Sequence, residues 1–138
     1  DAVAAIEGVQ RLRISSMEPM DVTEDLLDAM VANARTVVPH LHLPLQSGSD
    51  RILRRMNRQY DSSDYLRMIQ MAEEALTLDD LPPAITTDVI CGFPGESEAD
   101  HQATLALVRN EVHPDLADLG LPAKVLQNAV SRGQERAP

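Results

Sequence analysis

The sequence predicts an α/β fold with a parallel sheet, arranged as a partial (β/α) barrel. Three short runs of aliphatic and β-branched residues alternate with longer runs in which apolar residues recur at the helical period. The strands are predicted at residues 12–16, 41–45 and 85–91. Because a helical stretch separates each strand from the next, the helices can return every strand parallel to the one before it.

Five helical stretches accompany these strands. The first is only the end of a helix, and Gly8 closes it. Pro19, which has no N–H, ends the first strand region. Ser97 caps the last helix, and Asp100 three residues on completes a weak form of the capping box. The helices are predicted at residues 2–9, 23–31, 50–56, 63–76 and 97–108.

Composition limits the classes of function. A net charge of −10 over 138 residues argues against a protein that binds nucleic acid on its own. No apolar run approaches the roughly 20 residues of a membrane span, and no signal peptide is visible at Asp1. Cys91 is the single cysteine, which excludes an internal disulfide and favours a cytoplasmic chain. Since the chain opens on Asp1 and not on Met, we expect it to begin within a longer gene.

Polar and small residues follow each predicted strand. They occupy residues 15–18, 46–50 and 92–96. In a parallel barrel the carboxyl ends of the strands meet at one rim, where the chemistry takes place. Gly48 can take a positive φ or let a ligand approach the backbone. An ordinary turn with a capped helix explains the middle stretch equally well, but three such stretches together favour a binding site.

Four segments of the sequence resemble the radical S-adenosylmethionine (SAM) methylthiotransferases. They lie in the order and spacing of that family between Arg11 and Val108. The resemblance is strongest to the branch that acts on threonylcarbamoyladenosine in tRNA. The segments are residues 11–19 (RLRISSMEP), 40–50 (HLHLPLQSGSD), 54–58 (RRMNR) and 86–96 (TTDVICGFPGE).

The resemblance implies a cofactor set and a reaction. In the family, a 4Fe–4S cluster held by a CxxxCxxC loop reduces SAM to a radical that abstracts hydrogen from the target carbon. Sulfur and a methyl group are then added to an adenosine next to the anticodon. Glu18 and Arg58 are the catalytic candidates, Glu18 for an amino group of the cofactor or for the substrate, and Arg58 for a carboxylate or phosphate. The residues implied in SAM binding are Gln46, Ser47, Gly48, Ser49, Ile90, Gly92, Pro94, Gly95 and Glu96.

Each candidate also has a purely structural explanation. The small and rigid residues Gly92, Pro94 and Gly95 could serve only to shape a turn. Glu96 could simply favour the N-terminus of the helix that follows it. Arg58 could be an ordinary surface residue.

Two histidines and the cysteine give no metal site. His40 and His42 resemble metal ligands, but on a strand they are more often structural. Cys91 reads as a small buried hydrophobic residue. One cysteine cannot hold a cluster that needs three, so no cluster is expected in this chain.

The resemblance covers only the middle of a radical SAM domain, about its third to fifth strands. Residues 1–112 are predicted as a partial core domain, and residues 113–138 as a divergent helical tail with a helix at 122–133. The first two strands of the family, which carry the cluster loop, are expected before Asp1. Its terminal RNA-binding domain is also missing from this sequence.

Two hypotheses follow. The chain is either a fragment of a tRNA methylthiotransferase, whose activity belongs to the complete protein, or a non-catalytic α/β remnant or binding module. In either case we expect the chain alone to bind neither nucleic acid nor membranes. Open sheet edges at residues 12–14 and 85–91 are expected to make it self-associate.

Overall fold

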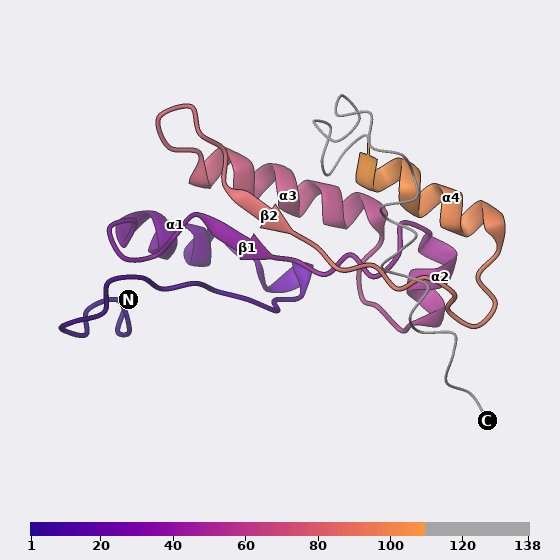
Figure 1. Ribbon diagram of the computed structural model, residues 1–138, viewed down its shortest axis with the longest axis horizontal. Coiled ribbons are helices and arrows are strands. Elements are labelled where there is room, and N and C mark those ends of the chain that lie inside the picture. The colour runs from indigo at the N-terminus through magenta and orange to yellow at the C-terminus, as the bar shows by residue number, and fades with distance from the viewer. Residues whose placement is uncertain (110–138) are drawn as a thin grey trace.

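Two parallel strands, β1 (His40–His42) and β2 (Ala84–Thr86), lie at the centre of the structure (Figure 1). Their register pairs Leu41 with Ile85. The computed structural model describes residues 1–109, so the predicted tail helix lies outside the described part. The α/β class and the parallel pairing predicted from the sequence are therefore confirmed.

Four α-helices and one 3₁₀ helix accompany the strands within residues 1–109. Three of the α-helices begin at a side chain that accepts a hydrogen bond from their first turn, namely Thr23, Asp61 and Ser97. The helices are η1 (Pro19–Asp21), α1 (Glu24–Ala32), α2 (Asp50–Arg55), α3 (Ser62–Leu76) and α4 (Glu98–Leu107). Within residues 1–109, none has the length and apolar character needed to cross a membrane.

The strand predicted at residues 41–45 is shorter than expected and ends at His42. The reason is local, because Pro44 has no N–H to give to a sheet ladder. The next residue, Leu45, donates its N–H to the side-chain Oγ1 of Thr87 at 2.9 Å and not to a backbone carbonyl. A hydroxyl group thus replaces one rung of the ladder.

The strand predicted at residues 85–91 is likewise shortened and ends at Thr86. Beyond Thr86 the segments that follow the two strands stay side by side, since Gln46 and Val89 form an isolated parallel bridge. The N–H of Ile90 then donates to the carbonyl of Gln46 at 2.8 Å. The pairing therefore continues to the end of both predicted strands, with one interruption.

The first predicted strand, at residues 12–16, is reduced to a single parallel bridge between Leu12 and Val37. Ser16 has a φ of 58°, which interrupts the extended backbone that a longer strand would need. A barrel of three regular strands is therefore not formed by the described residues, although the three segments do lie next to one another.

Residues 2–9 form turns and not the end of a helix. The N–H of Ala5 reaches the carbonyl of Asp1 at 3.1 Å, but the bonds that follow span only three residues. An isolated stretch this short cannot offset the cost of starting a helix. Gly8 closes the segment with a φ of 89°.

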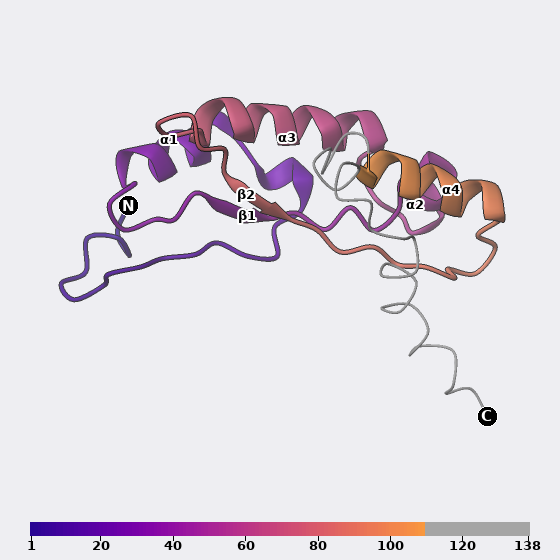
Figure 2. The same cartoon turned by 45° about the horizontal axis from the view of Figure 1, so that its top comes forward.

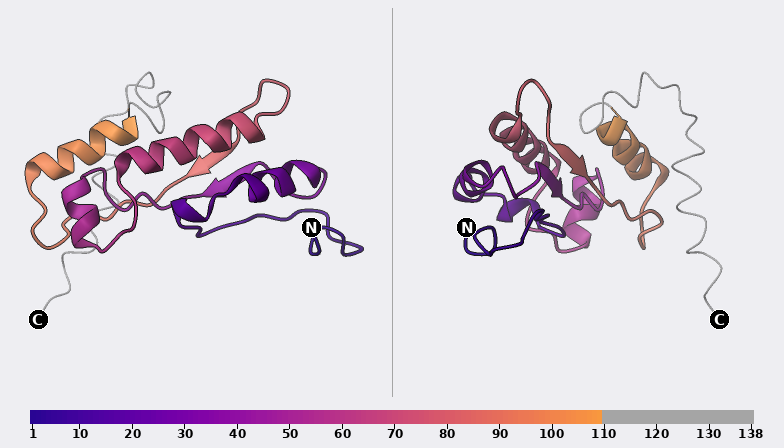
Figure 3. Two further views of the ribbon diagram at one scale, coloured as in Figure 1. Left: turned by 180° about the vertical axis from the view of Figure 1, so that it is seen from behind. Right: turned by 60° about the vertical axis from the view of Figure 1, so that its left-hand side comes forward.

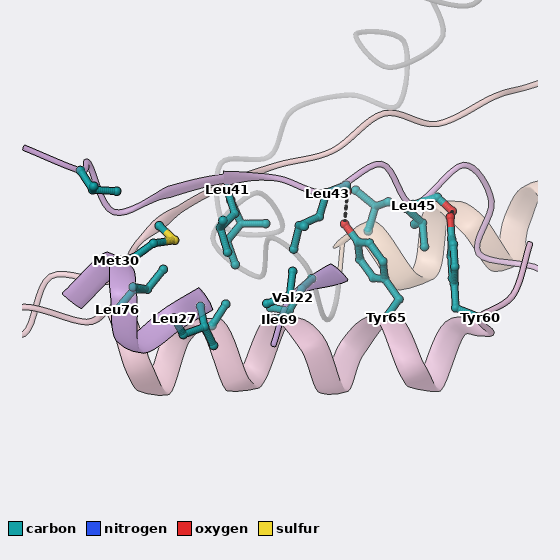
Figure 4. Close-up of a cluster of buried hydrophobic side chains, with 14 of the residues drawn as sticks. Val22, Leu27, Met30, Leu41, Leu43, Leu45, Tyr60, Tyr65, Ile69 and Leu76 are labelled. Carbon is teal, nitrogen blue, oxygen red and sulfur yellow. Dashed lines mark hydrogen bonds between the residues drawn. The ribbon is translucent and has the colours of Figure 1, made fainter. Parts of the chain in front are cut away.

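The core lies between the strands and α3 (Figure 4). Leu41, Leu43 and Leu45 are fully buried and point at the face of α3 that carries Tyr65 and Ile69. Burying a leucine of this kind contributes about 1.5–3 kcal/mol. The rest of this core comes mostly from α1, α3 and the segments beside them, namely Val22, Leu27, Met30, Val37, Ala72 and Leu76.

The helices cover only one face of the strands (Figure 2). On the other face Thr86 and Asp88 are exposed and His42 is half-buried. Parallel sheets are ordinarily covered on both faces. In the described part of the chain, the second face of this sheet is instead polar and open. The strands run toward α2 and α4, which lie together at one end of the structure (Figure 3).

Candidate functional site

The carboxyl ends of the two central strands bring the two predicted SAM-binding stretches together. The bridge between Gln46 and Val89, with the hydrogen bond from Ile90 to Gln46, sets the turn after β1 beside the loop after β2. The sequence placed both at one rim, and the structure agrees. The assignment of their residues to a cofactor stays a prediction.

The turn after β1 is fixed to helix α4. The Gly48 N–H donates to Oγ1 of Thr104 at 2.8 Å, and Oγ of the fully buried Ser47 lies 3.3 Å from that same oxygen. A Cβ added to Gly48 would lie 2.6 Å from the Thr104 Cα. Glycine is therefore needed here so that the backbone of the turn can approach the backbone of α4.

A buried carboxylate joins the turn to two other segments. Asp100 accepts a hydrogen bond from Ser49 Oγ at 2.6 Å and forms an ion pair with Arg51. Arg51 also donates to the carbonyl of Gly95 at 2.8 Å. The Arg51 guanidinium, with help from the hydroxyls of Ser49 and Ser97, holds the pKa of Asp100 well below its usual range. Sequence reasoning saw Asp100 only as a capping residue and missed this connection.

Two glycines shape the loop after β2. Gly92 and Gly95 take φ values of 75° and 82°, in the left-handed region that favours glycine. Glu96 accepts a hydrogen bond from the Gly92 N–H, so its carboxylate closes the loop. A Cβ on Gly95 would lie 2.6 Å from Nη1 of Arg55. Pro94 is exposed at the tip of the loop.

The two catalytic candidates, Glu18 and Arg58, form an ion pair with Nη1 of Arg58 2.7 Å from Oε1 of Glu18. They line a pocket of about 160 Å³ at the carboxyl end of β1. Gln46 lines the same pocket, which links it to the predicted SAM-binding turn. We call this cavity the Arg58 pocket.

Unusual backbone conformations gather at the Arg58 pocket. Ser16 and Gln46 line it with φ values of 58° and 65°, and Asn57, next to Arg58, has a φ of 59°. Such conformations cost of the order of 1–3 kcal/mol each and persist where the surrounding structure enforces them. They are typical of functional sites.

Tyr60 lines the pocket and is fixed to the backbone that follows β1. Its hydroxyl donates to the carbonyl of Pro44 at 3.1 Å and lies 3.3 Å from that of Leu45. Burial raises the pKa of Tyr60, so the phenol stays protonated and keeps both contacts. Only a general rule could have indicated this role from the sequence, namely that a buried tyrosine hydroxyl usually finds a hydrogen-bond partner.

The histidines on β1 are bound by protein groups. Arg13 donates to Nε2 of His40 at 2.8 Å, which leaves the proton of the neutral ring on Nδ1. Burial lowers the pKa of His40. His42 Nε2 lies 3.3 Å from a carboxylate oxygen of Asp88. Among residues 1–109, no three histidine, cysteine or acidic side chains come together as a metal site would require.

Cys91 is half-buried and not fully buried as predicted, because it lies where the loop leaves the strand. Burial raises the pKa of its thiol. A 4Fe–4S cluster of the radical SAM kind needs three thiolates. The residues of this chain therefore do not fit such a cluster.

Comparison with known proteins connects these features to a family. A family model described as the Radical SAM superfamily matches residues 2–108. The chain is 48% identical over 109 residues to a tRNA-2-methylthio-N(6)-dimethylallyladenosine synthase of Caldicellulosiruptor saccharolyticus, covering 79% of this chain and 22% of that protein. Proteins of the same name from Corynebacterium urealyticum and Thermobifida fusca are 50% and 49% identical over 78% of this chain, and it covers 19% and 21% of them.

These relatives confirm the resemblance to methylthiotransferases. The chain spans about a fifth of the length of the curated relatives it matches. Their names specify dimethylallyladenosine, whereas the sequence resembles the threonylcarbamoyladenosine branch, and the choice of branch stays a prediction. The family match covers nearly all of the described residues, and the chain belongs to the radical SAM superfamily.

Proposed function

We propose that this chain is the central part of a tRNA methylthiotransferase, which adds a methylthio group to a modified adenosine next to the anticodon. The observation that supports this most is its identity of 48–50% with proteins named for a methylthiolated adenosine, over nearly four-fifths of the chain. Both strand-end turns lie within the stretch that the radical SAM family model matches. The activity belongs to the complete protein.

Within that protein, the cluster cysteines come from outside these 138 residues. When bound to the complete protein, SAM and the cluster would supply the radical chemistry of the reaction. In this chain Gln46 and Ile90 are the best placed to contact SAM, because both lie beyond the carboxyl end of a strand and are hydrogen-bonded to each other. Ile90 is 43% exposed, so it offers an apolar surface that fits a purine ring.

The neighbouring turn residues have a supporting role in this proposal. The polar groups of this turn form hydrogen bonds with α4, which hold Gln46 in place. The residues concerned are Ser47, Gly48 and Ser49. In the same way Gly92 and Glu96 fix the loop that follows Ile90.

The substrate and location follow from the same proposal. The partner of the complete protein is tRNA, and the modified base belongs to the threonylcarbamoyladenosine branch. The lone cysteine suits a reducing compartment, and we place the protein in the cytoplasm. For the chain alone we propose self-association through its open sheet edges.

The complete reading frame provides the test. It is expressed in a host that lacks its own methylthiotransferases, and the tRNA nucleosides are analysed by mass spectrometry. We expect a 2-methylthio derivative of the modified adenosine, and its loss when the cluster cysteines are replaced. Arg67→Gln, which removes only an exposed ion pair with Asp64, is the control and should retain the product. Unmodified tRNA, or flanking DNA with no CxxxCxxC in frame, would favour the non-catalytic module.

A further inference from the structure

We propose that the exposed arginines of helix α2 form a surface that contacts the phosphate backbone of RNA. The surface consists of Arg54 and Arg55, with Arg51 beside them, and we call it the α2 arginine stripe. The inference rests on the proposed function, because tRNA is the partner proposed there. It concerns the place of contact on this chain, which that proposal leaves open.

The positive charge of the chain is concentrated at α2. The whole chain has a net charge of −10 and only 12 lysines and arginines. Four of them fall within the eight residues 51–58 (RILRRMNR). A cluster of arginines along one helix is the electrostatic footprint of a surface that binds nucleic acid.

Ion pairs neutralise the first and the last of these four arginines. Arg51 pairs with Asp100 and also donates to the carbonyl of Gly95 at 2.8 Å. Arg58 pairs with Glu18 in the Arg58 pocket. The segment therefore runs along the rim of the candidate site, from the loop after β2 to that pocket.

The two arginines between them keep their charge. Arg54 and Arg55 are exposed, and neither forms an ion pair within residues 1–109. Asp50, one turn before Arg54, uses its carboxylate to accept the N–H of Ser62 at 2.9 Å. Two positive charges therefore face solvent at this rim.

Contact with Gly95 fixes the position of the stripe. A Cβ added to Gly95 would lie 2.6 Å from Nη1 and 2.8 Å from Nη2 of Arg55, so the guanidinium lies against the backbone of the loop after β2. Arg51 and Arg55 are one turn apart and share a face of the helix. Since α2 lies at the end toward which the strands run (Figure 3), a nucleotide at the rim would bring its phosphates to this face.

The chemistry of the stripe favours phosphate over a protein partner. The apolar residues of α2, Ile52 and Leu53, are fully buried, and its exposed residues are arginines. Protein–protein interfaces have an apolar, often aromatic centre, which the exposed face of α2 lacks. A guanidinium binds phosphate through two parallel N–H groups, without any apolar contact.

The acidic remainder of the chain limits the strength of the contact. It repels RNA, so the chain alone should not hold RNA at physiological salt. Two free arginines neutralise about two phosphates, and each contributes about 0.7 to the slope of log affinity against log salt on a single strand. The contact should therefore be weak, local and visible only at low salt.

The test is amide NMR of the 138-residue chain during titration with an anticodon stem–loop RNA. We expect shifts at residues 51–55, and an affinity that falls about 15- to 20-fold between about 20 mM and 150 mM salt. Arg54→Gln with Arg55→Gln should weaken binding at least about tenfold at the lower salt. Arg55→Lys, which keeps the charge, should bind nearly as the parent chain does. Arg35→Gln is the control, since Arg35 is exposed beyond α1 and forms no ion pair within residues 1–109.

Several results would overturn the inference. These are the absence of shifts, shifts centred outside α2, and RNA binding that the double variant leaves intact. Equal binding of polyglutamate would assign the stripe to an acidic protein, and equal shifts with inorganic phosphate would show an adventitious anion contact. Amide dispersion reports whether each variant folds, and a folded Arg55→Lys keeps the comparison decisive. The tRNA assay on the complete frame is independent, so failure of the stripe and failure of the proposed function are separate results.

Discussion

Gly48 and Thr104 are in backbone contact across 56 residues of sequence: a Cβ on Gly48 would lie 2.6 Å from Cα and 3.1 Å from N of Thr104. The Thr104 Oγ1 that accepts the Gly48 N–H also bonds to the carbonyl of Asp100, one turn earlier in α4. This contact joins the turn after β1 to the helix after β2, so the two predicted SAM-binding stretches form one packed unit.

Gly48→Ala tests that contact. We expect it to reduce the free energy of unfolding by about 1–3 kcal/mol, because the methyl group must push two backbones apart. Denaturant unfolding measures the change. Gly8→Asn is the control, since Gly8 has nothing within 4 Å of an added Cβ and asparagine tolerates its positive φ. Equal stability of Gly48→Ala and the parent chain would show that the contact is not tight.

Asp100 should make the chain sensitive to acid. Its pKa is lower in the folded chain than in the unfolded chain, so its stabilisation is fully present above the unfolded value, about pH 4. It is lost as the pH falls below that value toward the folded pKa. Asp100→Asn removes the carboxylate that Arg51 and Ser49 bind.

The measurement is the urea midpoint as a function of pH for the parent chain and Asp100→Asn. We expect the variant to be less stable near pH 7 and the difference to shrink below about pH 4. Asp64→Asn, which removes an exposed ion pair at the start of α3, serves as the control for the loss of a capping carboxylate. A difference that stays constant down to pH 2 would contradict this assignment.

Tyr65 anchors β1 to α3. Its hydroxyl donates to the carbonyl of Leu43 at 2.8 Å and lies 3.0 Å from Oγ1 of Thr87 (Figure 4). The side chain is fully buried, and burial raises its pKa to about 12. Tyr65→Phe should cost about 1–2 kcal/mol of unfolding free energy, because the buried carbonyl of Leu43 and the half-buried hydroxyl of Thr87 lose a partner. Thermal unfolding of Tyr65→Phe, with Tyr60→Phe measured for comparison, gives the change. A Tyr65→Phe variant more stable than the parent chain would contradict the prediction.

The single cysteine predicts the outcome of cluster reconstitution. With iron, sulfide and reductant in the absence of air, we expect the chain to acquire no stoichiometric 4Fe–4S cluster, since Cys91 alone cannot supply three thiolates. Iron analysis and absorbance spectra measure this. About four irons per chain, lost in Cys91→Ala, would contradict the prediction.

The sequence predicted the helices well because their signals are local. The helix expected at residues 63–76 is found at Ser62–Leu76, with Tyr65 and Ile69 on its buried face as the apolar period indicates. Ser97 and Asp100 form the expected capping box. The capping residues that begin these helices lie next to them in the sequence, so no tertiary information is needed to predict where the helices start.

The strands and the site were less predictable because they depend on distant partners. The interruption at Pro44 is filled by the hydroxyl of Thr87, more than forty residues away. The pairing of Glu18 with Arg58 spans 40 residues and follows only from the folded chain. At residues 2–9 the sequence predicted the end of a helix, but the segment forms turns because no packing supports a helix there.

Amide NMR of the chain during titration with SAM tests whether the two strand-end stretches form a SAM site. We expect weak binding, of millimolar affinity and about −4 kcal/mol, since these residues do not hold the cluster that would bind the methionyl group. Shifts should be confined to residues 46–49 and 90–96 and should disappear in Gly92→Val, whose side chain is strained at a φ of 75°. Shifts at the opposite end, around α1 and the start of β1, or tight binding unaffected by Gln46→Ala and Gly92→Val, would contradict it.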